Sequence, residues 1–411
     1  MPNPPPTPGA LAGVRVLDLT RVLAGPYCGQ LLADLGAEVI KVERPVSDGH
    51  GGGDDTRAWG PPYVKDRDSH STDVSTYYVA ANRGKKSIAI DLASVDGQRT
   101  VKALATISDV VLENYKVGQL ARYGLDYASL SLLKPSLIYC SITGFGQTGP
   151  WAKRPGYDFI VQGLSGFMSI TGEREDACPT CHGGPPQKAG VAISDLLTGI
   201  YSATAILAAL LHVRKTGQGQ HIDMALLDVM IATMANMNTA YLNSGEVPGR
   251  VGNAHLSIVP YQVFACADGH LILAVGNDIQ FRRFCAAAGC SGLGEDPRFA
   301  INPARVKNRA VLVPLLEAIL MGRTKQAWIA RLEAADVPCG PIDRIDEVFE
   351  NPQVQARGMR FEMPHEEAGT LALVRNPMRM SATPPAYDLP PPALDEHRAE
   401  ILAMLDAAKH G

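Results

Sequence analysis

The feature that most constrains the fold is the order of elements between residues 14 and 43. An apolar run, Val14–Leu19, is predicted to be a buried strand and ends in a turn that contains Ala24-Gly25-Pro26. A helix is predicted from Tyr27 to Leu35, and Glu38–Glu43 is predicted to be a second strand. Strand, helix and strand in this order form a βαβ unit, in which a right-handed crossover joins two parallel strands.

The same alternation continues along the chain and predicts an α/β fold with a parallel sheet. A basic turn and a strand are expected in Asn82–Asp91, and further strands at Asp109–Asn114, Leu137–Ile142 and Gly219–Met224. In open sheets of this class ligands bind beyond the carboxyl ends of the strands, here Thr20–Pro26 and Glu43–Pro45. The glycine pattern GxGxxG is missing from the first turn, which argues against a nicotinamide cofactor.

The length of 411 residues predicts more than one domain. From about Val247 the pattern changes to a hairpin, Val259–Phe264 with His270–Val275, followed by amphipathic helices. We expect an open Rossmann-like large domain built from both ends of the chain and a small α+β domain between them. The expected ranges are 1–10 for a disordered proline-rich tail, 11–225 and 336–411 for the large domain, and 226–335 for the small domain.

Composition is that of a globular protein, with 46% hydrophobic and 19% charged residues. A formal net charge of −4 gives no reason to expect nucleic acid or an anionic membrane as a partner. Eight cysteines are too few for a disulfide scaffold and fit a reducing, cytoplasmic location. Cys178-Pro-Thr-Cys181-His182 is half of a zinc-binding pattern without a second half, so no metal site is predicted. The chain does not open with a signal peptide pattern.

The most informative polar residue is Asp195, which stands before a long apolar helix predicted from Leu196 to Lys215 and ending at Thr216-Gly217. Polar residues within this helix favour a core helix over a membrane span. Ser194 or Asp195 can cap the helix start, whose first N–H groups need an acceptor. Alternatively, Asp195 is a nucleophile or base in a dry cleft. The local pattern leaves both interpretations open.

Several motifs together resemble those of the class III (formyl-CoA transferase, CaiB/BaiF type) CoA-transferases. No single motif is specific, but they occur in the family's order from about residue 11 to 385. They are Leu17-Asp-Leu-Thr20 with Ala24-Gly25-Pro26, Leu32–Pro45, Asn82-Arg83 with Lys86-Ser87, Glu113-Asn114-Tyr115, Tyr157-Asp158, Asp195, Lys215–Gly219 and Val337–Pro341.

The resemblance implies an interlocked homodimer whose active sites use coenzyme A thioesters and carboxylic acids as substrates, with CoA as a cosubstrate rather than a bound cofactor. Asp195 matches the family's nucleophilic Asp, and Asp158 matches an acidic position near it. Arg44 matches the residue that packs on the adenine. The other positions matching the CoA site are Asn114, Tyr115, Arg122 and Tyr123.

The sequence departs from formyl-CoA transferase at three places. Leu23 replaces a Gln that contacts the reacting centre, which makes oxalate and formyl-CoA poor substrate candidates. The glycine run of the small domain is replaced by Gly252–Tyr261, which is similar to the succinyl-CoA:glutarate branch of the family. A short insertion lies between Tyr157 and Asp195.

The nearest alternative with the same fold is an α-methylacyl-CoA racemase. Racemases of the family place a His directly before the position of Asp158, and here that residue is Tyr157. A tyrosine of ordinary pKa is a poor base near neutrality, which favours the transferase. A CoA-binding protein without catalysis is a further alternative.

Four further residues are candidates for substrate contacts. N–H groups near Gly144 and Gly146, in the loop Thr143–Pro150, are suited to stabilise an oxyanion. Arg83 is a candidate for the far carboxylate of a dicarboxylate acceptor, because an arginine binds a carboxylate bidentately, with a surface position or a contact to a CoA phosphate as alternatives. His255 is a candidate for contact with the acyl group, with a structural role as the alternative.

Overall fold

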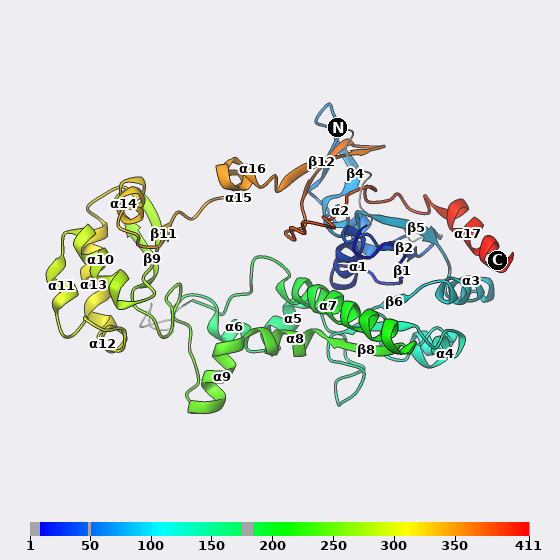
Figure 1. The fold of residues 1–411 in the computed structure, drawn as a ribbon, viewed down its shortest axis with the longest axis horizontal. Coiled ribbons are helices and arrows are strands. Elements are labelled where there is room, and N and C mark those ends of the chain that lie inside the picture. Colours follow the sequence, from blue (N-terminus) through cyan, green and yellow to red (C-terminus); the bar gives the residue numbers. More distant parts are fainter. Residues whose placement is uncertain (1–8, 48–50, 175–183, 411) are drawn as a thin grey trace. The chain divides into compact units, whose positions relative to one another are not determined.

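The computed structural model describes residues 9–47, 51–174 and 184–410. The chain forms two compact units, with boundaries at Phe167/Met168, Lys188/Ala189, Ser244/Gly245 and Pro352/Gln353. The "sheet unit" comprises the chain up to Phe167, the segment Ala189–Ser244 and the chain from Gln353 onward. The "small unit" comprises Met168–Lys188 and Gly245–Pro352. Figure 1 shows the elements of both units in sequence colours.

A six-stranded parallel sheet forms the centre of the sheet unit, with strand order β5-β2-β1-β6-β7-β8. The strands are β1 (Arg15–Asp18), β2 (Glu38–Glu43), β5 (Lys85–Ala89), β6 (Val110–Glu113), β7 (Ile138–Thr143) and β8 (Gln220–Ala225). In order of appearance this is the Rossmann arrangement 3-2-1-4-5-6, so the parallel α/β expectation is confirmed. The order reverses between β1 and β6, which pair directly, Leu17 beside Val111.

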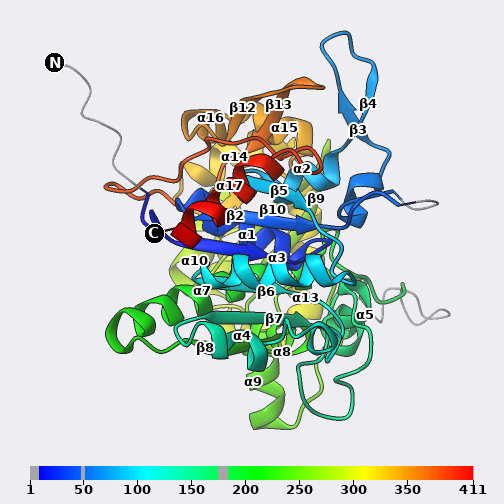
Figure 2. The same ribbon diagram turned by 90° about the vertical axis from the view of Figure 1, so that its right-hand side faces the viewer.

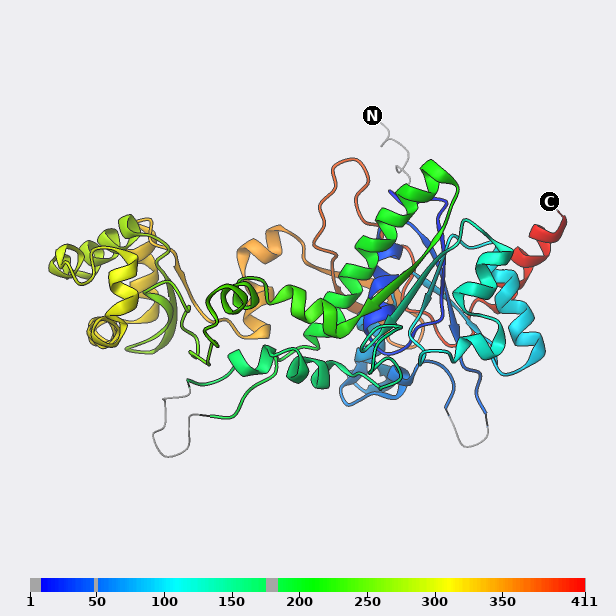
Figure 3. The same cartoon turned by 90° about the horizontal axis from the view of Figure 1, so that it is seen from below.

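Helices cover both faces of this sheet, as Figure 3 shows. One face carries α1 (Ala24–Asp34), α7 (Ile193–Thr216) and α8 (Leu226–Thr233), and its core includes Cys28, Leu32 and Ile206. The other carries α3 (Val95–Thr106), α4 (Tyr127–Leu133) and α17 (Arg398–His410), with Leu104 and Ile401 in the core. The strands are apolar on both sides because each side is buried under helices.

Smaller elements complete the sheet unit. Two antiparallel hairpins, β3–β4 and β12–β13, come from distant parts of the sequence, and Figure 2 shows both. The remaining elements are η1 (Asp55–Ala58), β3 (Tyr63–Lys65), β4 (Ser71–Ser75), α2 (Thr76–Asn82), η2 (Leu120–Tyr123), α5 (Asp158–Leu164), α9 (Ala235–Ser244), α16 (Pro352–Ala356), β12 (Arg360–His365) and β13 (Gly369–Val374).

The small unit has its own core around Phe264, Phe281 and Trp328. The predicted hairpin is confirmed as β9 (Tyr261–Cys266) and β10 (Gly269–Ala274), and β11 (Cys339–Gly340) pairs with β10. The helices of this unit are α6 (Phe167–Ile170, starting at the boundary), α10 (Asp278–Ala288), α11 (Ser291–Glu295), α12 (Asn302–Lys307), α13 (Arg309–Leu320), α14 (Lys325–Glu333) and α15 (Ile345–Glu350).

Several features differ from the sequence prediction. The expected boundary at 225/226 lies instead at 244/245, because Leu226 and Met230 pack into the core of the sheet unit. The expected boundary at 335/336 lies at 352/353, and the described residues between Met168 and Lys188, expected in the large domain, belong to the small unit. The expected helix Leu226–Asn243 is broken into α8 and α9, and Ala235 has a φ of 39° at the break. The segment 47–75, expected to be a loop, contains η1 and the β3–β4 hairpin. Residues 1–8 of the predicted disordered tail and 178–182 of the cysteine motif lie outside the described residues.

Candidate active site

Two adjoining cavities lie at the carboxyl ends of the central strands of the sheet unit. The "strand-end cavity" measures about 210 Å³ and is lined by residues that include Arg44, Asp54 and Tyr123. The "Asp195 cavity" measures about 300 Å³ and is lined by residues that include Asn114, Asp158 and Asp195. Both are lined by Arg21, Tyr115 and Gln119, so they share a wall. This wall lies at the carboxyl ends of β1 and β6, where the strand order reverses and ligands are expected.

Asp195 lies in the first turn of α7, and it does not cap that helix. The cap position is Ala192, which has no side-chain acceptor. The acceptor is Asp158, at the start of α5, whose Oδ1 accepts the N–H of Ser194 at 2.8 Å and its hydroxyl at 2.7 Å. The capping interpretation of Ser194 or Asp195 is therefore wrong. Within the described residues, the Asp195 carboxylate accepts no hydrogen bond and faces the cavity.

Burial and a neighbouring negative charge both raise the pKa of Asp195. Removal from water, and then the negative charge of Asp158, raise the pKa of Asp195 from 3.8 to about 7. Asp158 is itself held by Gln162, whose amide donates to its Oδ2 at 2.7 Å. Gln162 in turn accepts the N–H of Ala189 at 2.8 Å. A partly buried carboxylate without donors is more basic and more nucleophilic than an exposed one.

α1 and α7 approach each other closely beside Asp195, and a glycine makes this possible. A Cβ on Gly199 would lie 2.7 Å from the carbonyl oxygen of Ala24, closer than real contacts. Gly199 follows Asp195 by one helical turn and shares its face of α7. Asp195 therefore faces the start of α1 and the turn before it, and Val22, Leu23 and Ala24 line the same cavity.

The structure brings most of the expected CoA-binding residues to these cavities. Arg44, Tyr115 and Tyr123 line the strand-end cavity. Asn114 lines the Asp195 cavity, and its side-chain amide also holds the backbone of Arg21, accepting its N–H at 3.0 Å and donating to its carbonyl at 2.7 Å. Arg122, in contrast, is exposed and lines neither cavity.

Of the two glycines expected to donate to an oxyanion, only Gly144 lines the Asp195 cavity. A Cβ on Gly144 would lie 2.5 Å from the Cα of Gly156, so two backbones meet there. The N–H of Gly146 donates to the hydroxyl of Thr143 at 2.9 Å and is therefore occupied. The prediction for Gly146 is wrong because the loop uses this N–H to close its own turn.

The structure places Arg83 outside both cavities and His255 in the small unit. The guanidinium of Arg83 is buried and forms two hydrogen bonds with Asp34, at 2.8 and 2.7 Å. It lines neither cavity, so the prediction that it binds a substrate carboxylate is wrong for this arrangement of the chain. His255 belongs to the small unit, where its Nδ1 accepts the N–H of Ser257 at 3.0 Å and its ring contacts Tyr261.

Several residues of the site were missed from the sequence. Arg21 lies over the ring of Tyr115, with 5.5 Å from its Cζ to the ring centroid, and pairs with Asp55 at 3.0 Å. Lys153 and Arg154 also line the Asp195 cavity. Arg21 directly follows the first predicted strand, so its place at the strand end was a usable signal. Lys153 and Arg154 lie in an exposed loop with no such signal.

Tyr77 in α2 was also missed. Burial first, and then the charges of Asp195 and Asp158, raise its pKa to about 12. Its ring packs edge-on against Trp59, with the centroids 4.9 Å apart. Its hydroxyl therefore stays protonated near neutral pH and can donate a hydrogen bond.

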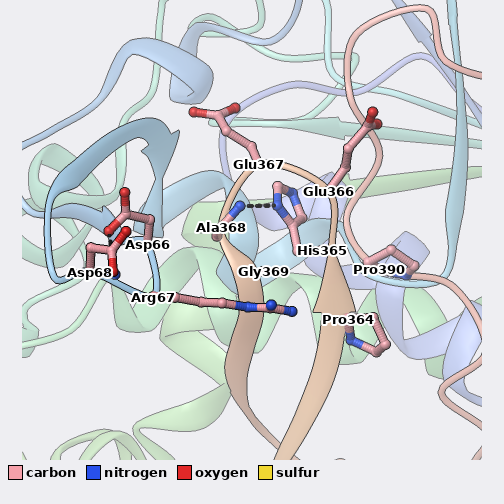
Figure 4. A pocket seen from close by; sticks show the side chains of 10 residues that line it. All are labelled: Asp66, Arg67, Asp68, Pro364, His365, Glu366, Glu367, Ala368, Gly369 and Pro390. Atoms are coloured by element: carbon pink, nitrogen blue, oxygen red, sulfur yellow. Dashed lines mark hydrogen bonds between the residues drawn. The ribbon is translucent and has the colours of Figure 1, made fainter.

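A third cavity of the sheet unit lies between the turns of the β3–β4 and β12–β13 hairpins (Figure 4). Its neighbourhood contains Asp66, Asp68 and His70, whose ligand atoms lie within 4.8 Å of one another. Asp66 Oδ1 already accepts the N–H groups of Asp68 and His70, both at 2.9 Å, and so closes the hairpin turn. These groups form a hairpin turn on the surface.

Comparison with known proteins agrees with this geometry. The family model described as CoA-transferase family III matches residues 11–398. The chain belongs to CoA-transferase family III. It is 52% identical to a succinate–glutarate CoA-transferase of Agrobacterium fabrum, over 99% of this chain and 97% of that one. It is 41% identical to the human succinyl-CoA:glutarate CoA-transferase, over 95% and 85% of the two chains.

Solved structures agree as well. A CaiB/BaiF family protein from Brucella suis superimposes with a TM-score of 0.83 at 46% identity, covering 97% of this chain and 100% of that one. The protein is thus a CoA-transferase, and the family expected from the motifs is confirmed. Among the described residues one helix, α7, is long and apolar enough to cross a membrane by length and composition, as the core helix of a globular protein can also be. Ala203, Ile206 and Ala209 of this helix lie in the core of the sheet unit.

Proposed function

We propose that this transferase moves CoA from succinyl-CoA to a dicarboxylate such as glutarate, with Asp195 as the nucleophile. The observation that carries this proposal is an unbonded carboxylate in a cavity at the reversal point of a Rossmann sheet. The substrate pair is supported by the relatives named for succinate and glutarate. No observation favours the racemase.

In the proposed reaction, the Asp195 carboxylate attacks the thioester carbonyl and expels the CoA thiolate, which leaves a mixed anhydride. The thiolate then attacks the aspartyl carbonyl and releases the donor acid. The acceptor carboxylate attacks this aspartyl-CoA thioester and expels the thiolate, which leaves a second mixed anhydride. The thiolate then attacks the acceptor's acyl carbon, which forms the new acyl-CoA and releases the Asp195 carboxylate. Each intermediate hydrolyses in water, so the burial that raises the pKa of Asp195 also protects the intermediates.

We assign the CoA moiety to the strand-end cavity and its thioester to the Asp195 cavity. Arg44 borders the first cavity beside Tyr115 and Tyr123, which suits an adenine and its phosphates. Gly144 lies in the second cavity, where its backbone can approach an acyl group closely.

The cation for the far carboxylate of the acceptor is assigned to Arg154, in place of Arg83. Its guanidinium lies over the rings of Trp151 and Phe145, with 5.0 and 5.7 Å from Cζ to the centroids. Within the described residues it has no carboxylate partner, and it lines the Asp195 cavity. A stacked, planar guanidinium is well suited to bind a carboxylate with two parallel hydrogen bonds.

A homodimer and a cytoplasmic location complete the proposal. The sheet unit exposes large apolar side chains on α7, α8 and α9, among them Leu211, Ile231 and Leu242. Apolar patches of this kind mark protein interfaces. The cysteines that the structure describes are all free, as expected in a reducing compartment.

Mass spectrometry of the intact protein tests the nucleophile. After mixing with succinyl-CoA, we expect an adduct of the mass of CoA or of the acyl group, removed by hydroxylamine and located on the peptide that contains Asp195. Asp195→Ala should form none. Exchange of the α-proton with solvent without any adduct would instead support the racemase.

A further inference from the structure

The turn that follows β1 has an unusual backbone conformation beside the nucleophile. Val22 has a φ of 72°, in the left-handed region that β-branched residues rarely adopt. Val22 lines the Asp195 cavity together with Leu23 and Ala24. Such conformations persist only where surrounding contacts impose them, and they concentrate at functional sites.

A buried carboxylate contacts the backbone of Val22. The N–H of Val22 donates to Oδ1 of Asp54 at 3.1 Å. The side chain of Asp54 is fully buried, and its Oδ2 pairs with Lys41 at 2.9 Å. Lys41 also donates to the carbonyl of Thr20 at 2.8 Å. The Asp54–Lys41 pair therefore holds the turn at two backbone positions, on either side of Arg21.

The backbone of Arg21 is held from another strand end by the two hydrogen bonds of Asn114. Three consecutive residues, Thr20 to Val22, are thus fixed by side chains. Asp54 also lines the strand-end cavity assigned to CoA, while the turn that it holds lines the Asp195 cavity. The carboxylate of Asp54 therefore borders one cavity and is hydrogen-bonded to the wall of the other.

We propose that Asp54 is a positioning residue of the transfer reaction. Its hydrogen bond to Val22 holds this one residue in a left-handed conformation within the turn Arg21–Ala24, and this sets the wall of the cavity opposite Asp195. A thioester bound between this wall and Asp195 is then kept at attacking distance. This inference rests on the proposed transferase function and adds a residue to it.

The test is a pair of substitutions, Asp54→Asn alone and combined with Val22→Gly. Asparagine has one oxygen, so it cannot accept from both Val22 and Lys41. We expect kcat with succinyl-CoA and glutarate to fall about 100-fold, as a displacement of about 1 Å costs in many enzymes, while KM for the donor changes much less. Glycine adopts the φ of Val22 without cost. The kcat of the double variant Asp54→Asn with Val22→Gly should therefore be at least about tenfold higher than that of Asp54→Asn alone.

The matched control is Asp34→Asn, which weakens another buried bidentate ion pair, with Arg83, away from both cavities. It should lower the thermal unfolding midpoint and leave kcat unchanged. A wild-type kcat in Asp54→Asn, or a failure of Val22→Gly to rescue it, overturns the positioning role. A wild-type protein that transfers no CoA and forms no adduct on Asp195 overturns the proposed function instead.

Val22→Pro decides the question if Asp54→Asn does not fold. Proline fixes φ near −65° and has no N–H, so the turn cannot adopt its conformation, while the buried pair Asp54–Lys41 stays intact. We expect about a 100-fold loss of kcat in a folded protein with native circular dichroism. A folded Val22→Pro variant with wild-type kcat contradicts the proposal.

Discussion

At the scale of single residues, the site depends on two carboxylates with different surroundings. Asp158 accepts N–H, hydroxyl and amide hydrogens at the start of α7. Asp195 lies next to it without a donor, and its pKa is raised to about 7. The same carboxyl group therefore serves as a cap in one position, and in the other it has the surroundings of the nucleophile that we propose.

The rate of transfer should depend on the ionisation of Asp195. Only the carboxylate attacks, so kcat/KM should rise with pH through a midpoint near 7. Asp158→Asn removes the neighbouring negative charge that raises this pKa, so the midpoint should move to lower pH. Burial, the larger cause, remains, and the midpoint should stay above the ordinary value of 3.8. A profile of kcat/KM against pH measures both, and an unshifted midpoint would show that Asp158 does not act on the charge of Asp195.

Arg154 should determine the preference for dicarboxylate acceptors. Arg154→Gln removes the stacked guanidinium from the lining of the Asp195 cavity. KM for glutarate should therefore rise by at least about tenfold, since hydrogen bonds to charged groups contribute about 1.5–3 kcal/mol. KM for a monocarboxylate such as butyrate should not change. Arg99→Gln, on the exposed surface of α3, is the control. A larger rise in KM for succinyl-CoA than for glutarate would assign Arg154 to the CoA phosphates.

The strained turn is the other feature at this scale. A left-handed Val22 costs on the order of 1–3 kcal/mol, which the hydrogen bonds of Asp54 must offset. The pKa of Asp54 is lowered to about 2 against the effect of burial, by the charge of Lys41 and by hydrogen bonds that include the N–H of Val22. The carboxylate therefore stays ionised throughout the pH range of the transfer experiments.

At the scale of elements, the contact between α1 and α7 determines where Asp195 lies. α7 is apolar on several sides, so its rotation and depth depend on what it packs against rather than on an amphipathic pattern. Gly199 allows the backbone of α1 to approach at Ala24. This single close approach places the first turn of α7 beside the turn after β1.

Gly199→Ala should therefore impair both stability and catalysis. A Cβ would lie 2.7 Å from the carbonyl of Ala24, so the helices must move apart. We expect a loss of about 1–3 kcal/mol in unfolding free energy, typical of overpacking, and a lower kcat because Asp195 moves. Thermal or denaturant unfolding and steady-state kinetics measure these effects. Gly292→Ala, which meets no atom within 4 Å, is the control. An unchanged kcat in a destabilised Gly199→Ala variant would show that the close approach of α1 and α7 affects stability but not catalysis.

At the scale of the whole molecule, the described chain forms two units, each with its own hydrophobic core. The sheet unit carries both cavities and Asp195, and its core continues on both faces of one sheet. The small unit has a separate aromatic core and contains His255. The exposed apolar side chains of α7, α8 and α9 are the feature that one chain leaves unexplained.

Native mass spectrometry should therefore find a species of twice the chain mass of 43.8 kDa. Replacing exposed apolar side chains by charges, as in Leu211→Glu with Leu242→Glu, should weaken the dimer, because burying unpaired charges in an interface is unfavourable. Lys102→Glu on α3 changes a charge without changing an apolar residue and serves as the control. A monomeric wild type that transfers CoA at full rate would contradict the dimer.

The sequence by itself determined the class of fold and the family. Parallel strands buried on both faces appear as continuous apolar runs, and turn residues separate them from the helices, so Val14–Leu19 and Glu38–Glu43 could be recognised locally. Arg44, Tyr115 and Asp195 were found because family motifs and strand ends mark them. The ranges of the units were less accurate, because α8 resembles the start of a new domain until its packing is known.

Tertiary structure decided what each polar side chain does, because hydrogen-bond partners come from distant parts of the chain. Asp158 caps a helix that begins 35 residues later along the chain, at Ile193, and this leaves Asp195 free. Arg83, suited by type to bind a substrate, is instead paired with Asp34 in the interior. The bond between Asp54 and Val22 joins a loop to a turn, and no local pattern could show it. Residue type determines which interactions are available, and only the packed chain determines which of them form.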